Sequence, residues 1–398
     1  MRILVCPHQS GMGGSQLNAI ELAMAMRRYG HDPVVFAAPG LLTGLLRSVD
    51  LEWVEAPAPE APALAWSRKM AETVRRHGIE LIHAYEWRPC LQAAFGSGRR
   101  IPLLMSVMSM EIPRFLPTHV PIVVGTPELQ QRMRDQGRTS YLVEPPVDMT
   151  RYRSTDVPAA RRRWDIPDET LVISVVSMLT TALEKVQGVL EAIRVVDRMA
   201  AARPVRLLIA GDGEGREAVE KRAAAVNHRH GRTVVHALGF QLDSSPVYEA
   251  ADVVLGMGSS ALKGLAHAKP LVVHGEAGFW RLLTEESAPE FLHGGWYGRG
   301  GAGAGDLARA VDQLVESAEL RARLGSFGRE LVVGRYGLDT AADRLAAIYE
   351  DTAHSAGDRS TMVRSLVRSA AGSARYYTSM RFGSVVAREQ WAREGAIA

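Results

Sequence analysis

The sequence has few cysteines, a small net charge and no long apolar segment. Its 398 residues include only two cysteines, Cys6 and Cys90, which excludes a disulfide framework and a cysteine-based metal cluster. No apolar run approaches the roughly 18 residues that a membrane-spanning helix needs. The net charge of +3 is too small to indicate a nucleic-acid partner. The first residues also lack the three regions of a signal peptide, so we expect a cytoplasmic protein.

Lysine is scarce as well, because the basic residues are nearly all arginine. The lysines are Lys69, Lys185, Lys221, Lys263 and Lys269. This bias makes a lysine within a motif more noticeable, and both Lys185 and Lys263 lie in motifs discussed below. Cys6 ends an apolar segment, and we expect it to be a buried, unreactive thiol.

Short apolar segments alternate with helical patterns along most of the chain, which predicts parallel sheets covered by helices on both faces. This alternation is interrupted once, by a stretch rich in Pro, Asp and Arg near residues 147–168, and then begins again. We therefore expect two Rossmann-like α/β domains, at 1–150 and 168–350, and an Arg-rich helical extension at 351–398. The predicted strands are 2–7, 33–38, 80–85, 102–107, 121–125, 141–146, 171–178, 205–215 with its glycine turn, 232–240, 251–258 and 269–275.

Glycines mark three loops. Gly13 and Gly14 lie between the first predicted strand and a helix that begins near residue 15, where a helix N-terminus favours an anion. A plain tight turn explains the same glycines. The second loop is "GDGEG" at 211–215, again between a strand and a helix. The third, "GRGGAGAG" at 298–305, is expected to be flexible. Lys185 precedes another helix and is either a phosphate contact or a solvated lysine.

Four segments together resemble the GT-B glycosyltransferases, specifically the large retaining family that uses nucleotide-diphospho-sugars. They are "VSMLTTALEKVQG", "LLIAGDGEG", "VYEAADVVL" and "LGMGSSALKGLAHAKPLVV", in the family's order and at its separations. The pair Gly13 and Gly14 matches the family's N-terminal glycines. The resemblance covers residues 1–350 and implies two Rossmann-like domains facing each other across a cleft.

The sequence departs from that family at its charged positions. Two glutamates, eight residues apart, usually contact the donor sugar and the nucleotide ribose, but these positions hold Leu255 and Lys263. The family's phosphate-binding arginine falls near Ser177, and a histidine of its N-terminal domain falls on Met108. The phosphate-binding lysine is retained as Lys185.

The residues that remain suit an anion. Gly256, Gly258, Ser259 and Ser260 follow a predicted strand and open a helix, where backbone N–H groups and two hydroxyls can hold a diphosphate. Lys185 adds a positive charge. Lys263 lies one helical turn further and is either a second phosphate contact or a solvated helix lysine.

The candidate acids and bases lie at predicted carboxyl ends of strands. His83 and Glu86 lie at the end of one strand, and His274 and Glu276 lie at the end of another. We expect His83 and Glu276 to act on the substrates, with a buried core histidine as the other interpretation of His83. Glu276 is a candidate to replace the carboxylate that Leu255 lacks.

The resemblance implies a glycosyltransferase that needs no metal or cofactor and takes a nucleotide-diphospho-sugar as its donor. The acceptor is a small molecule or an envelope component, and transfer retains the anomeric configuration. Two alternatives stay open: a pseudo-glycosyltransferase or nucleotide-sugar-modifying enzyme on the same fold, and a non-catalytic partner protein. The Arg-rich extension leaves peripheral contact with a membrane surface open, and the sequence gives no oligomeric state.

Overall fold

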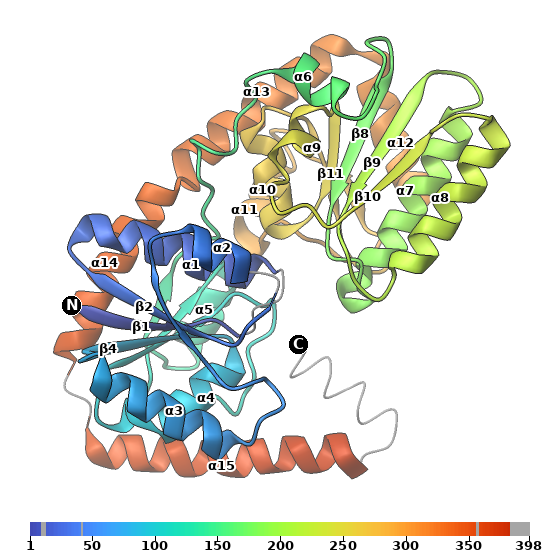
Figure 1. The fold of residues 1–398 in the computed structure, drawn as a ribbon. Helices are drawn as coiled ribbons and strands as arrows, with labels where there is room; N and C mark the ends of the chain where they lie inside the picture. The colour runs from blue at the N-terminus through green and yellow to red at the C-terminus, as the bar shows by residue number, and fades with distance from the viewer. Residues whose placement is uncertain (9–12, 41–42, 356–357, 383–398) are drawn as a thin grey trace. The chain divides into compact units, whose positions relative to one another are not determined.

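The computed structural model describes residues 1–8, 13–40, 43–355 and 358–382. The chain divides into two compact units (Figure 1). Unit 1 contains Met1–Pro145 and Leu338–Ala398, and unit 2 contains Pro146–Gly337. Each unit is built on one open sheet with helices on both faces, as the alternating pattern predicts.

Unit 1 has a seven-stranded sheet in the order β3-β2-β1-β4-β5-β6-β7, and its strand pairs are all parallel. The strand order reverses between β1 and β4. The strands are β1 (Arg2–Cys6), β2 (Asp32–Ala37), β3 (Glu52–Glu55), β4 (Leu81–Tyr85), β5 (Leu103–Val107), β6 (Ile122–Val124) and β7 (Ser140–Leu142). The helices are α1 (Gly14–Met26), α2 (Thr43–Ser48), α3 (Ala63–Arg76), α4 (Trp87–Phe95), α5 (Pro127–Asp135), α14 (Leu338–His354) and α15 (Arg359–Phe382).

Both faces of this sheet are buried at its centre because the inner strands are apolar at most positions. Alternate residues of β1 enter different clusters: Leu4 and Cys6 pack with α3 and α4, whereas Ile3 and Val5 pack with α1 and α14. A strand that buries side chains on both sides reads as a continuous apolar run rather than as an alternating one. This is why "RILVC" forms a central strand.

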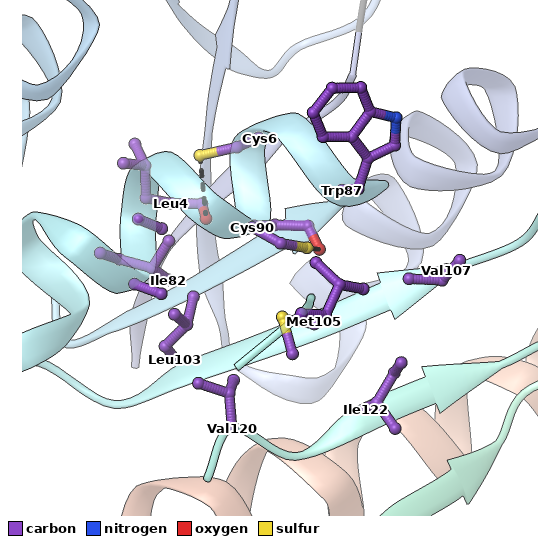
Figure 2. Close-up of a cluster of buried hydrophobic side chains, with 14 of the residues drawn as sticks. Leu4, Cys6, Ile82, Trp87, Cys90, Leu103, Met105, Val107, Val120 and Ile122 are labelled. Atoms are coloured by element: carbon purple, nitrogen blue, oxygen red, sulfur yellow. Dashed lines mark hydrogen bonds between the residues drawn. The ribbon is translucent and has the colours of Figure 1, made fainter. Parts of the chain in front are cut away.

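Both cysteines lie in the first of these clusters (Figure 2). Cys6 Sγ lies 4.0 Å from the carbonyl oxygen of Leu4, and Cys90 Sγ lies 3.4 Å from that of Ala84. Both thiols are free and buried, and burial raises the pKa of each. The expectation that Cys6 is a buried thiol is confirmed, and the high pKa keeps it in the unreactive protonated form.

Unit 2 has a six-stranded sheet in the order β10-β9-β8-β11-β12-β13, in which only β13 runs antiparallel to its neighbour. Its strands are β8 (Leu171–Val176), β9 (Val205–Ala210), β10 (Val235–Gly239), β11 (Val253–Gly256), β12 (Leu271–His274) and β13 (Trp280–Leu282). Its helices are α6 (Val157–Arg162), α7 (Lys185–Met199), α8 (Arg216–His230), α9 (Ser245–Glu249), α10 (Gly258–Ala266), α11 (Ala288–Gly294), α12 (Ala304–Glu316) and α13 (Ala318–Arg335).

Helices α7, α8 and α12 cover one face of this second sheet. Helices α9, α10, α11 and α13 contribute to the cluster on the other face. Among the helices that the structure describes, none is long and apolar enough to cross a membrane.

The expected domain boundaries need a correction. Helix α14 was expected to end the second domain at residue 350, but Leu345 and Tyr349 pack in unit 1 beside β1. The stretch 147–168 was expected to be a boundary, but Tyr152 and Trp164 belong to the core of unit 2. In both segments the packing of aromatic side chains shows the unit to which the segment belongs. Tyr349 fills a cluster of unit 1, whereas Tyr152 and Trp164 fill a cluster of unit 2.

Candidate functional site

A pocket lies at the carboxyl ends of three neighbouring parallel strands in unit 2. Strands β8, β11 and β12 end at Val176, Gly256 and His274, and the strand order reverses between β8 and β11. Open parallel sheets bind ligands where the order reverses. The pocket holds about 280 Å³ of space, part of it open to solvent. Its lining is Val175, Ser177, Lys185, Gly188, Val189, Leu255, Gly256, Met257, Ser260, His274 and Trp280.

Lys185 brings a positive charge into this pocket. It is the first residue of α7, and burial lowers the pKa of its ammonium group. Among the residues that the structure describes, no carboxylate forms an ion pair with it. A partly buried cation without a counter-ion is costly, so the pocket is suited to an anionic ligand.

His274 lies in the same pocket, at the end of β12. Its ring packs on Trp280, with 4.5 Å between the ring centroids. Burial and the nearby charge of Lys185 lower the pKa of His274 to about 4, so the imidazole is neutral at pH 7. Helix α7 makes room for it at Gly188, where a Cβ would lie 2.2 Å from Nε2 of His274.

The first turn of α10 supplies only part of the expected phosphate cradle. Gly256 and Ser260 line the pocket, whereas Gly258 and Ser259 do not. Gly258 has a φ of 55° and donates its N–H to the carbonyl oxygen of Trp296 at 2.7 Å. That N–H is therefore already paired within the protein. The Ser260 hydroxyl donates to the carbonyl oxygen of Met257 at 3.1 Å, so its proton is already paired within the protein as well.

Lys263 is not in the pocket, which corrects its predicted role as a second phosphate contact. Its side chain is 5% exposed, and Nζ lies 4.6 Å from the centre of the Tyr152 ring. Tyr152 belongs to the core of unit 2 beneath α10. The ammonium group is held by the electron-rich face of the ring, so Lys263 is part of the packing.

The glycines at 211–215 position the loop that carries Lys185. A Cβ at Gly211 would lie 1.8 Å from the carbonyl oxygen of Ser177, and a Cβ at Gly215 would lie 1.9 Å from Val186. Gly215 also donates its N–H to the carbonyl oxygen of Leu179 at 2.8 Å. Close approach of two loops therefore explains this motif, without a phosphate.

Two residues before Lys185 have a strained backbone. Leu183 and Glu184 have φ values of 56° and 51°, in the left-handed region that side chains disfavour. The Glu184 carboxylate accepts the N–H of Ala277 at 2.9 Å, which ties this loop to the one that follows β12. Strain of this kind concentrates at functional sites.

Glu276 does not line the pocket, although it was expected to act on the donor sugar. Its half-buried carboxylate accepts from the Tyr297 hydroxyl and from Nη2 of Arg299, the latter at 2.5 Å. The expectation that residues 298–305 form a flexible loop is wrong for their first part. Three backbone N–H groups of this loop donate to residues 276–278 at 2.9 Å, namely those of Gly300, Gly301 and Gly303. Glu276 thus helps to hold this loop.

His83, the other expected catalytic residue, is a core residue of unit 1. It is 1% exposed, and its ring nitrogens are 2.7 Å from the Tyr349 hydroxyl and 2.7 Å from the Ser106 hydroxyl. Burial lowers its pKa to about 3, so it is neutral. Since both nitrogens are engaged and covered, His83 cannot reach a substrate, and its expected role is corrected to a structural one.

The carboxyl edge of the unit 1 sheet instead presents Glu86. It follows β4 with a φ of 61°, and burial raises the pKa of its carboxyl group. That carboxylate accepts from the hydroxyls of Ser15 at 2.9 Å and Ser109 at 2.5 Å, and from the N–H of Met108 at 3.0 Å. Glu86 therefore joins the start of α1 to the ends of β4 and β5.

The predicted glycine loop of unit 1 is described only in part. Gly13 precedes α1 with an extended backbone at φ −149°, and Gly14 is the first residue of the helix. Residues 9–12 of the loop lie outside the described residues. A role of Gly13 and Gly14 in anion binding stays a prediction.

No family model matches the chain. A curated relative, the α-D-kanosaminyltransferase of Streptomyces kanamyceticus, is 27% identical over 201 residues, which are 48% of this chain and 48% of that protein. The match thus spans about half of the relative's length.

Solved structures extend the likeness to most of the chain, at low sequence identity. A glycosyltransferase from Rickettsia africae has a TM-score of 0.69 at 15% identity, over 89% of this chain and 99% of that one. HepE of Anabaena, in complex with UDP, has a TM-score of 0.68 at 18% identity, over 88% and 100%. Sucrose-phosphate synthase of Thermosynechococcus elongatus has a TM-score of 0.69 at 14% identity, over 88% and 98%. The chain has the GT-B fold.

Within this GT-B chain, sequence reasoning missed Gly188 as a site residue. The only signal was a glycine inside a helical pattern, where it costs stability and needs a reason. The structure supplies that reason, because the glycine admits His274. Leu255 was identified as a departure, and its apolar side chain does line the pocket.

Proposed function

We propose that the protein is a glycosyltransferase whose nucleotide-diphospho-sugar donor binds in the pocket of unit 2. The observation that carries the proposal is the unpaired ammonium of Lys185 at the N-terminus of α7, which shares the pocket with Ser177 and Ser260. A helix N-terminus and a cation bind phosphates in proteins. The two hydroxyls donate to the carbonyl oxygens of Met178 and Met257, so each would have to turn to bind a phosphate. The names of the curated relative and of the Rickettsia structure support transfer of a glycosyl group.

The geometry suits stabilisation of a departing diphosphate. In the proposed reaction the bond between the sugar C1 and the diphosphate oxygen breaks, and its electron pair stays on that oxygen. The acceptor oxygen or nitrogen forms the new bond to C1 and releases its proton to the departing diphosphate or to water. Lys185 and the N-terminus of α7 offset the negative charge that develops, in a pocket partly closed to water. This chain's own contribution is thus electrostatic.

The proposed donor differs from that of the related retaining enzymes at its sugar. Leu255 is 1% exposed and lines the pocket at the position of the family's first glutamate. An apolar side chain cannot accept a hydrogen bond from a sugar hydroxyl, and a buried hydroxyl without a partner is costly. We therefore propose a donor sugar that lacks a hydroxyl at this contact, or one that turns it away. Retention of configuration and the identity of the acceptor stay proposals from the family resemblance.

The test compares two lysines of unit 2. Calorimetry with UDP, dTDP, GDP and ADP, and with their glucose conjugates, should find one nucleotide that binds. Lys185→Ala should weaken that binding by about tenfold or more, because a charge-assisted contact is worth about 1.5–3 kcal/mol. Lys263→Met should leave the affinity within about twofold, because its ammonium contacts Tyr152 and not the pocket.

Equal affinity of wild type and Lys185→Ala would disprove this donor site. Product analysis with the nucleotide that binds then separates the activities. A new glycoside supports the proposal, whereas an altered donor favours a nucleotide-sugar-modifying enzyme. No product from any acceptor favours a non-catalytic partner protein.

A further inference from the structure

The pocket holds a second basic side chain that the proposed reaction has not used. His274 enters it from β12, whereas Lys185 enters from α7. The related enzymes place an arginine near Ser177, and Ser177 also lines this pocket. The diphosphate of a nucleotide-diphospho-sugar carries two negative charges, and Lys185 offsets only one of them.

Fixed neighbours hold the imidazole of His274 in place. Gly188 accepts the ring against α7, where a Cβ would lie 2.2 Å from Nε2. Trp280 packs on the ring, and its indole nitrogen donates to Glu191 Oε2 at 2.7 Å. The tryptophan is thereby anchored to the same helix as Gly188. The ring position is thus set by packing and not by hydrogen bonds of the ring itself.

The ring nitrogens of His274 have no hydrogen-bond partner in the part of the chain that the structure describes. This differs from His83, where hydroxyls lie 2.7 Å from both ring nitrogens. A histidine that only fills a core needs such partners because buried polar atoms are costly when unpaired. The ring of His274 instead borders a pocket that can take a ligand.

We propose that His274 is the second cationic contact of the donor diphosphate and takes up a proton when the donor binds beside Lys185. This inference rests on the proposed function. In the free protein the imidazole is neutral because it is buried and lies near the ammonium of Lys185. A bound diphosphate offsets that ammonium and adds negative charge, so it favours the imidazolium.

The carboxylates around the pocket have partners within the protein, so we assign the proton uptake to His274. Glu191, on the adjoining turn of α7, accepts from Trp280 and lies 3.7 Å from Arg194. Glu184 accepts the N–H of Ala277, and Glu276 is paired with Arg299. These carboxylates already have partners. The electrostatic change on binding therefore falls on Lys185 and His274.

Proton uptake makes donor affinity depend on pH in a defined direction. The bound state holds one more proton than the free state, so affinity rises as pH falls. The affinity rises only between two pH values, which are the pKa of His274 in the free protein, about 4, and its higher pKa in the complex. Within that window the affinity changes by up to about tenfold per pH unit.

The experiment is calorimetry with the nucleotide-diphospho-glucose that binds most tightly among the four named above. Its diphosphate has no titrating proton between about pH 5.5 and 8.5, so a pH effect comes from the protein. Titrations in two buffers of different ionisation enthalpy should give net proton uptake. His274→Gln should abolish the uptake and should weaken binding by about three- to tenfold near pH 6 and less than twofold near pH 8.5.

Two further variants control for indirect effects. His236 is a half-buried histidine at the amino end of β10, and His236→Gln should keep the wild-type uptake. Gly188→Ala should displace the imidazole and reduce the uptake, but should add little when combined with His274→Gln.

The outcomes separate the two proposals. Donor binding without proton uptake, or uptake that survives in His274→Gln, overturns the role of His274 and leaves the donor site standing. No binding by any of the four nucleoside diphosphates or their glucose conjugates overturns the proposed function and this inference with it. Uptake lost in His274→Gln and kept in His236→Gln supports both.

Discussion

Two buried histidines show that the surroundings of a side chain decide its role. His83 and His274 both lie on central strands, and burial lowers the pKa of each. Their difference lies in their partners. His83 contacts the hydroxyls of Tyr349 and Ser106, and Tyr349 lies 266 residues further along the chain. A partner at that separation is a property of the fold, so the short sequence around "LIHAYEW" predicts a strand but not the role of its histidine.

The buried, neutral His83 should make unit 1 sensitive to acid. Its pKa is about 3 in the folded protein and about 6.5 when unfolded, so between these values the unfolded chain binds more protons. Stability from this group is therefore complete above about pH 6.5 and is lost as pH falls toward 3. From pH 7.5 to 5 the loss is about 2 kcal/mol. Urea unfolding at both pH values should show an acid loss smaller by that amount in His83→Gln than in wild type.

Exposed His354 on α14 supplies the control for this experiment. His354→Gln should keep the full acid loss, because the residue is exposed to solvent. If His83→Gln and His354→Gln lose the same free energy between the two pH values, carboxylates and not His83 cause the acid sensitivity.

At the scale of elements, the last two helices complete unit 1. Helix α14 packs on β1 through Leu345 and Tyr349, and α15 packs on the opposite cluster. On α15 the ring of Tyr376 lies 5.9 Å from that of Trp87 and 5.2 Å from that of Phe115. Small residues bring the helix close, since a Cβ at Gly372 would lie 2.8 Å from Phe115.

Adjacent tyrosines on α15 allow a matched test of this packing. Tyr376 is 9% exposed and Tyr377 is 51% exposed. Tyr376→Ala should destabilise unit 1 by about 3 kcal/mol, because it leaves a cavity beside two aromatic rings. Tyr377→Ala should cost less than about 1 kcal/mol. Thermal unfolding should lower the melting temperature by about 6–12 °C for the first variant and by only a few degrees for the second. Equal shifts would show that α15 does not depend on this contact.

The sequence predicts every strand that the structure describes except the short edge strands β3 and β13, because the apolar patterns of the others are local. The sheet face that each helix covers could not be predicted from the sequence. The apolar stripe of α14, for example, would fit a sheet of either unit. The loop at 298–303 shows a second limit. Its glycine content predicts flexibility, but its backbone N–H groups donate to residues 276–278. Likewise "GDGEG" resembles a ligand loop, although a close approach to Ser177 explains its glycines. Such contacts join segments that are distant in sequence.

At the scale of the whole molecule, unit 2 is an insertion into unit 1. The chain leaves unit 1 after Pro145 and returns at Leu338. The ends of the insertion are adjacent, because Val147 donates its N–H to the carbonyl oxygen of Tyr336 at 2.8 Å and forms a bridge with Gly337. Each of the four buried clusters takes its side chains from one unit only. A unit with its own core and adjacent ends meets the requirements for independent folding.

Residues 146–337, expressed alone, should therefore fold and bind the donor nucleotide without transferring a sugar. The pocket residues all come from this segment, from Val175 to Trp280, so affinity should stay within about threefold of that of the full chain. Circular dichroism melting and calorimetry measure the two properties, and the same segment with Lys185→Ala should fold but bind at least about tenfold more weakly. A folded segment that has lost its affinity would mean that unit 1 supplies donor contacts. Full affinity without turnover would assign donor binding to unit 2 and show that transfer needs unit 1 as well.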